Sequence, residues 1–175
     1  MKSSRILDSR NSAMLLFTMC TAAFILGCQT ISLNPKGRTV PEAQRITMPE
    51  SGELRGIYET EDLTLSYSMF KTPSQLYISG EIRFAERIAA SFSIMQYFNL
   101  SVLLLDSQGK ALNLVPLTTV SRYGTQSATP PNYSLSFNTQ TRVPEVTRLI
   151  AFTYSGRALE PRGEGYMNIW EYPVY

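Results

Sequence analysis

Few residues in this chain could perform chemistry, because its 175 residues include no histidine and only two cysteines, Cys20 and Cys28. Without histidine, and with no cysteine after residue 28, Ser-His and Cys-His nucleophilic catalysis are excluded. The usual zinc sites are excluded as well. General acid–base chemistry would rest on carboxylates, tyrosines or the lysines Lys36, Lys71 and Lys110. The sequence therefore predicts a protein that is not an enzyme and that holds no metal or cofactor.

Two short segments look like chemical sites. Ser107-Gln108-Gly109-Lys110 matches the S-x-x-K motif of penicillin-recognising enzymes, but that motif needs its serine at the start of a helix, with the lysine one turn later. Here the glycine, together with Asp106 before the segment, is typical of a hairpin turn. Glu59-Thr60-Glu61-Asp62 groups three carboxylates without the ligand spacing and the glycine of a calcium loop. We expect a turn at the first segment and a solvated loop at the second.

The C-terminal segment carries the best candidates for a binding surface. Tyr166, Trp170 and Tyr172 share one face of an extended chain, and Met167 and Ile169 share the other. If Met167 and Ile169 face the core, the aromatic side chains form an exposed strip that suits a protein partner or a sugar ring. If Trp170 is the core aromatic, no such strip exists. The sequence favours this second arrangement.

Leu103 and Leu105 are a second pair of candidates. In Val102-Leu103-Leu104-Leu105 both faces of an extended segment are apolar, so one pair of side chains leaves the main core. We expect the segment 88–97 to cover that pair. If it were left exposed, it would form a partner-binding patch.

The elements that position these residues are predicted to be strands. Residues 63–69 and 76–84 alternate apolar and polar side chains, which offers one apolar face per strand. Further strands are expected at 98–105, 111–117, 133–137, 149–154 and 166–172. Ile88, Phe92 and Met95 are spaced for a short helix near 88–97, although this run could also be strand. About seven strands separated by turn signals indicate an all-β fold, an antiparallel two-sheet sandwich of immunoglobulin-like type.

The segments Tyr77-Ile78-Ser79-Gly80-Glu81-Ile82 and Val102-Leu103-Leu104-Leu105-Asp106-Ser107-Gln108-Gly109 resemble FxLYD-type immunoglobulin-like envelope domains. In those domains a strand with glycine precedes a strand that ends in an aliphatic-Asp-x-x-Gly turn. Leu103 and Leu105 stand where that family has Phe and Tyr. The resemblance covers about 35 residues and implies a sandwich without catalytic residues.

The N-terminus has the pattern of an export signal. Lys2, Arg5 and Arg10 precede an uncharged apolar run of 15 residues, 13–27, which is shorter than the roughly 20 residues of a membrane-spanning helix. The run ends in Ile25-Leu26-Gly27-Cys28, which resembles the lipobox of bacterial lipoprotein precursors. That resemblance implies removal of the signal peptide 1–27 and a diacylglycerol on Cys28. In an organism that has an outer membrane it also implies sorting to that membrane, because Gln29 and not Asp follows the cysteine.

Beyond the signal, composition divides the chain into two parts. Residues 28–53 contain three prolines and no aromatic residue, which is typical of a flexible tether. Residues 54–175 suit a single β-sandwich domain. From Gln29 onward there are 13 basic and 13 acidic residues, so no basic excess is available for binding nucleic acid.

These features predict a lipid-anchored, non-catalytic module of the cell envelope that binds another envelope protein. The alternative is a protein that binds carbohydrate or cell-wall polymer through an exposed Tyr/Trp face. Partner-binding candidates are Tyr166, Trp170, Tyr172, Leu103 and Leu105, and the lipid site is Cys28.

Overall fold

Antiparallel strands form most of the chain that the computed structural model describes, which is residues 34–91, 94–121, 134–160, 165–171 and 173. In these residues no helix is both long and apolar enough to cross a membrane. The elements in chain order are η1 (Glu42–Gln44), β1 (Ile46–Thr47), β2 (Gly52–Glu59), β3 (Leu63–Lys71), β4 (Gln75–Phe84), α2 (Glu86–Ser91), β5 (Ile94–Leu105), β6 (Ala111–Ser121), β7 (Ser134–Arg142), β8 (Leu149–Leu159) and β9 (Tyr166–Glu171).

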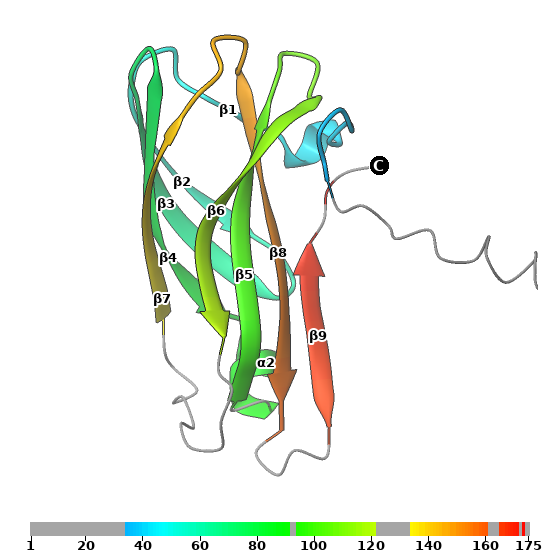
Figure 1. Cartoon of the computed structure of the whole chain (residues 1–175). Coiled ribbons are helices and arrows are strands. Elements are labelled where there is room, and N and C mark those ends of the chain that lie inside the picture. The colour runs from blue at the N-terminus through cyan, green and yellow to red at the C-terminus, as the bar shows by residue number, and fades with distance from the viewer. Residues whose placement is uncertain (1–33, 92–93, 122–133, 161–164, 172, 174–175) are drawn as a thin grey trace, which may run out of the picture. The chain divides into compact units, whose positions relative to one another are not determined.

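The strands form two sheets that pack face to face (Figure 1). One sheet has the order β2-β3-β4-β7, and the other has the order β1-β8-β5-β6, with β9 paired to β8. The chain changes sheet after β1, β4, β6 and β7. The last three crossings, from β4 to β8, follow the Greek-key connectivity of immunoglobulin-like sandwiches. The predicted all-β, antiparallel two-sheet sandwich is therefore confirmed.

The core lies between the inner faces of the two sheets, as the alternating sequence of the strands requires. On β3 the buried residues are separated by more exposed ones, and Leu65 and Met69 are fully buried. Phe98 and Phe152 fill the centre from the opposite sheet. The rings of Phe84 and Phe98 meet edge to face with centroids 5.0 Å apart, a geometry that adds to the stabilisation from burial.

Each strand predicted from the sequence is found, mostly with longer bounds. Residues 133 and 172 of two predicted strands lie outside the described residues. The ambiguous segment 88–97 combines the two structures expected for it. Helix α2 occupies Glu86–Ser91, and β5 begins at Ile94. Ile88 on the helix and Met95 on the strand are both buried, so apolar residues with helical spacing occupy two different elements here.

Residues 35–48, which we name the N-terminal arm, are folded onto the domain and differ from the predicted tether of 28–53. The backbone amides of Gly37 and Val40 donate to the carbonyl oxygens of Ala111 (2.8 Å) and Gly109 (2.9 Å). Strand β1 then pairs with β8. The compact unit begins at Pro35 rather than at residue 54. Low aromatic content was not a reliable sign of a flexible tether here. The arm is held by backbone hydrogen bonds and by Val40, which is fully buried.

The β5–β6 connection is the predicted hairpin turn. The Asp106 carboxylate accepts hydrogen bonds from the backbone amides of Gln108 (2.8 Å) and Lys110 (2.9 Å). Gly109 has a φ of 82°, a left-handed conformation that glycine adopts without strain. The S-x-x-K match therefore lies on a turn, where its serine and lysine have no helix to bring them together.

Candidate functional site

Strand β9 presents an aromatic strip to solvent. Tyr166 is 62% exposed and Trp170 is 68% exposed, whereas Ile169 is fully buried. The sequence favoured Trp170 as the core aromatic, and the structure contradicts this. Ile169 and Met167 pack against the core, so period-two alternation directs Tyr166, Asn168 and Trp170 outward. We name these three residues the β9 strip.

A side chain on the neighbouring strand β8 contacts Tyr166 and Asn168 of the β9 strip and holds them in place. The Arg157 guanidinium lies 4.8 Å from the centroid of the Tyr166 ring, and its Nε donates to the Asn168 side-chain oxygen at 3.0 Å. Arg157 and Asn168 are paired in the β8–β9 register. The cation–π contact and the hydrogen bond hold these side chains in one arrangement before any partner arrives, which lowers the entropic cost of binding.

The other candidate residues do not join this surface. Leu103 and Leu105 are fully buried in a second apolar cluster with Val40, Ala111 and Ala151. This cluster lies on the outer face of the β8-β5-β6 sheet, and the N-terminal arm covers it. The segment 88–97 does not, contrary to the prediction. Cys28 and Tyr172 lie outside the described residues.

Trp170 also lines an acidic cavity of about 400 Å³. The cavity lies between η1, the β2–β3 turn, β8 and β9, and its carboxylates are those of Glu59, Glu61, Asp62 and Glu171. Asp62 Oδ2 accepts a hydrogen bond from the Tyr154 hydroxyl at 3.1 Å, and its Oδ1 pairs with Arg87. The predicted solvated loop at 59–62 is therefore a turn whose last carboxylate is held by partners.

A polar network joins the arm to the cavity. Gln44 Nε2 donates to Glu171 Oε1 at 2.5 Å, and the hydroxyl groups of Thr60 and Tyr154 are 2.8 Å apart. Sequence reasoning missed Glu171 and Tyr154. No local pattern could have found them, because their partners Gln44 and Asp62 lie 127 and 92 positions away in the chain.

Burial and like charge raise the pKa values of three groups at the cavity, Tyr58, Tyr154 and Glu171. Desolvation by burial, followed by the charge of Glu171, raises the pKa of Tyr58 to about 12. Burial also raises the pKa of Tyr154 far above its usual range, and the charge of Asp62 adds to this. Burial, followed by repulsion from Asp62, raises the pKa of Glu171, while the hydrogen bond from Gln44 opposes the shift. The cavity therefore disfavours further negative charge at Glu171, although Asp62 itself is paired with Arg87.

Glu171→Gln is expected to stabilise the protein at neutral pH and to leave its stability unchanged at acid pH. Because the pKa of Glu171 is raised in the folded state, the folded state binds this proton more tightly than the unfolded state. The stability that the protonated Glu171 side chain contributes is complete below its ordinary pKa of 4.5. This stability is lost as the pH rises through the raised pKa of the folded state. Melting temperatures measured from acid to neutral pH test this.

Glu53→Gln is the comparison variant, because the pKa of Glu53 is shifted in the opposite direction to that of Glu171. Hydrogen bonds from Arg55, and then from Ser68, lower the pKa of Glu53, so its contribution is present at neutral pH and is lost as the pH falls. Parallel pH profiles for the two variants would contradict the assignment of Glu171 to a negatively charged cavity.

The β9 strip and the acidic cavity beside it offer exposed aromatic rings and hydrogen-bonding groups to a ligand. Among the described residues no three acidic, cysteine or histidine side chains are grouped so as to hold a metal ion. Comparisons with protein families, with curated proteins and with solved structures found no match to this chain.

Proposed function

We propose that this protein is a lipid-anchored, non-catalytic binding module of the cell envelope, which holds a partner protein at the β9 strip. The anchor is supported by the basic N-terminus, the apolar run 13–27 and the Ile25-Leu26-Gly27-Cys28 motif. Gln29 supports the outer membrane as its location. The Gly80 position in β4 and the Asp106-x-x-Gly109 turn after β5 agree with the FxLYD-type resemblance.

The observation that carries the proposal is the exposure of Trp170 and Tyr166 on one face of β9. Exposed aromatic side chains are the residues that most often become energetic anchors when a partner covers them. Among the described residues β9 pairs only with β8, so its other edge also offers backbone donors and acceptors. A partner strand could add to that edge.

Carbohydrate or cell-wall polymer is the second candidate ligand, and a specific observation favours it. Trp170 lines the cavity that contains the carboxylate of Glu171 and the amide of Gln44. An aromatic ring beside hydrogen-bonding groups of this kind suits a sugar ring with its hydroxyls. Competition by purified cell-wall polymer would distinguish the two ligands, because a protein contact alone would not be displaced.

Trp170→Ala and Tyr166→Ala are expected to weaken retention of the partner by about 30-fold or more each, the effect of removing an interface anchor worth about 2 kcal/mol. Because both side chains are exposed, the melting temperature should hardly change. The measurement is co-purification from solubilised membranes, quantified for each variant.

Phe70→Ala is the matched control. Phe70 is also an exposed aromatic residue, 48% exposed, but it lies on β3 in the opposite sheet. Its loss should leave the partner bound. If both β9 variants retained every co-purifying protein and polymer, the β9 strip would not be the binding surface.

A further inference from the structure

One end of the sandwich collects the N-terminal arm and three turns. We name it the entry end, and it comprises residues 35–51 and the β3–β4, β5–β6 and β7–β8 turns with flanking residues, 71–75, 105–111 and 142–149. The turns lie together at the top of Figure 1, where the arm also joins the domain. The Arg148 amide donates to the Leu105 carbonyl oxygen at 2.9 Å, and the Met48 amide donates to the Arg148 carbonyl oxygen at 3.0 Å. The arm and two of the turns are therefore hydrogen-bonded together.

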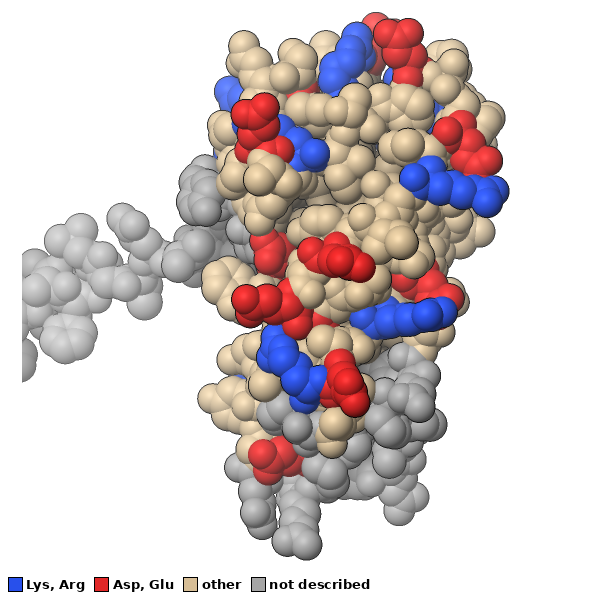
Figure 2. All heavy atoms as spheres, turned by 180° about the vertical axis from the view of Figure 1, so that it is seen from behind, with Lys and Arg blue, Asp and Glu red and all other residues tan. Residues whose placement is uncertain are grey.

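The entry end is basic although the chain beyond the signal is balanced. It holds seven basic residues and four acidic ones. The acidic residues are Glu42, Glu50, Asp106 and Glu145, and the basic residues are Lys36, Arg38, Arg45, Lys71, Lys110, Arg142 and Arg148. Seen from the rear, acidic and basic side chains are interspersed over the whole visible face, including its upper end (Figure 2), so the basic excess of the entry end is a matter of number and not of an unbroken patch.

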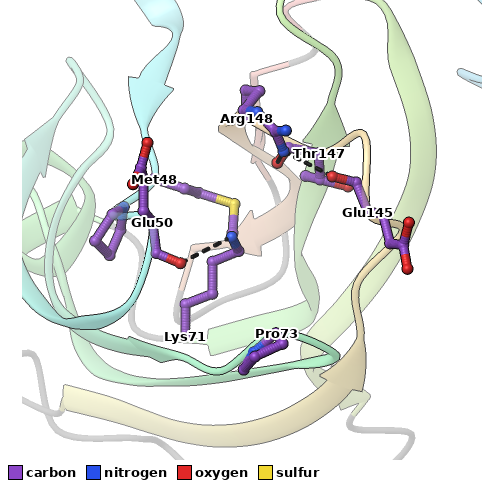
Figure 3. A pocket seen from close by; sticks show the side chains of 8 residues that line it. Met48, Glu50, Lys71, Pro73, Glu145, Thr147 and Arg148 are labelled. Atoms are coloured by element: carbon purple, nitrogen blue, oxygen red, sulfur yellow. Dashed lines mark hydrogen bonds between the residues drawn. The ribbon is translucent and has the colours of Figure 1, made fainter.

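A cavity of about 360 Å³ opens within the entry end. Lys71 extends into it from the end of β3, and its Nζ donates to the Glu50 carbonyl oxygen at 3.2 Å. Arg148 lines the opposite side (Figure 3). The carboxylate of Glu145 is directed away from Lys71 in this view (Figure 3). An ammonium group has three hydrogens to donate, so Lys71 can bind a further oxygen inside the cavity.

The wall of this cavity contains a buried hydroxyl group that lacks a partner. Thr147 is only 1% exposed, and among the described residues nothing makes a hydrogen bond to its Oγ1. A buried polar group without a partner is destabilising. An oxyanion in the cavity, between Lys71 and Arg148, would supply the negative charge that the two cations favour. A rotation of the Thr147 side chain toward the cavity would then let its hydroxyl donate to that anion.

The length of the chain before the arm limits where the entry end can lie. Six residues, 29–34, separate Cys28 from Pro35, and the two Cα atoms can be at most about 25 Å apart when the chain is fully extended. Strand β5 has 12 residues and spans about 40 Å. A lipid on Cys28 would therefore hold the entry end, rather than the far end, close to the bilayer.

We propose that the entry end docks on an anionic lipid surface and that the cavity of Lys71, Thr147 and Arg148 receives a headgroup phosphate. The orientation rests on the lipid anchor of the proposed function, whereas the basic surface and the cavity do not. Docking would leave the β9 strip free at the side of the domain for its partner. Each basic residue near an anionic bilayer strengthens the attraction, and salt weakens it.

The test uses the mature chain, residues 28–175, with Cys28→Ser, so that no lipid contributes to binding. It is sedimented with vesicles made of equal parts phosphatidylglycerol and phosphatidylcholine, and with vesicles of phosphatidylcholine alone. We expect binding to the first and not to the second. Lys71→Gln/Arg148→Gln should lower the partition coefficient by about 30-fold, the effect of two juxtamembrane charges.

Arg55→Gln/Arg83→Gln is the matched control, because it removes the same charge from exposed ion pairs on β2 and β4. It should bind as the unsubstituted chain does. An equal loss of vesicle binding in both double variants would show that only the net charge of the protein matters. That result would overturn the entry end as a docking surface. Failure of the unsubstituted chain to bind anionic vesicles would overturn it as well.

Two further variants keep the test decisive. Arg148 also holds the Glu145 and Thr147 carbonyl oxygens, so Lys71→Gln/Lys110→Gln replaces the first variant if that one does not fold. Thr147→Val replaces the hydroxyl by a methyl group, and unchanged affinity would overturn the part of the proposal that gives this hydroxyl to the phosphate. The protein in the vesicle assay carries no lipid of its own, and no partner is present. A negative result there is therefore distinct from a negative result in palmitate labelling or in partner co-purification, which test the proposed function.

Discussion

Leu103→Ala is expected to lower the free energy of unfolding by about 2–5 kcal/mol, although Leu103 lies on the outer face of its sheet. The side chain is fully buried among Val40, Ala111 and Ala151, so its removal leaves a cavity under the N-terminal arm. The arm is held to this face by backbone hydrogen bonds to Gly109 and Ala111 and cannot simply collapse into the space. Chemical denaturation of the purified domain measures the loss.

Ile57→Ala tests whether the arm is the cause. Ile57 is also an aliphatic residue on the outer face of a strand, but it is 67% exposed on β2. Its replacement should change the free energy of unfolding by no more than about 0.5 kcal/mol. Equal losses for the two variants would show that the arm does not protect Leu103 in solution.

Cys28→Ser is expected to abolish incorporation of labelled palmitate and to release the protein from membranes. The expectation follows from the basic N-terminus and the 15-residue apolar run that ends directly before Cys28. Two or more acyl chains on one residue hold a protein firmly, since each buried methylene contributes about 0.8 kcal/mol. The measurement is the label in the protein band, together with the distribution of the protein between membrane and soluble fractions.

Cys20→Ser provides the control within the same segment, because Cys20 is the only other cysteine in the chain. This variant should be labelled as strongly as the unsubstituted protein. Equal labelling of all three proteins would show that the acyl chain is attached elsewhere and would remove the basis for the anchor. Loss of label in Cys20→Ser alone would have the same consequence.

The sequence predicts those strands of the sandwich that have one face buried in the core and the other face exposed to solvent. Residues 63–69 and 76–84 alternate because β3 and β4 have one face on the core. The first strand of that sheet, β2, was missed for the converse reason. It is an edge strand with no fully buried residue, and it places Ile57 in solvent, so hydrophobic alternation does not mark it.

The path of the N-terminal arm could not be predicted from its own residues. Its composition is that of a linker, with three prolines in 28–53 and no aromatic residue. It folds because backbone donors meet acceptors on the β5–β6 hairpin and because Val40 covers Leu103 and Leu105. These contacts join residues 63 to 74 positions apart in the chain, from Val40–Leu103 to Gly37–Ala111, and local patterns carry no information about such pairings.

The sequence alone predicts a β-sandwich with a turn at 106–109, and it contains no histidine and no cysteine after Cys28. Which surface of the domain is open depends on tertiary packing. Both faces of β9 and of 102–105 carry large apolar or aromatic side chains, so alternation alone cannot tell which face is inside. Packing decided it, because Ile169 fits between the sheets and leaves Trp170 outside, and because the arm buries Leu103.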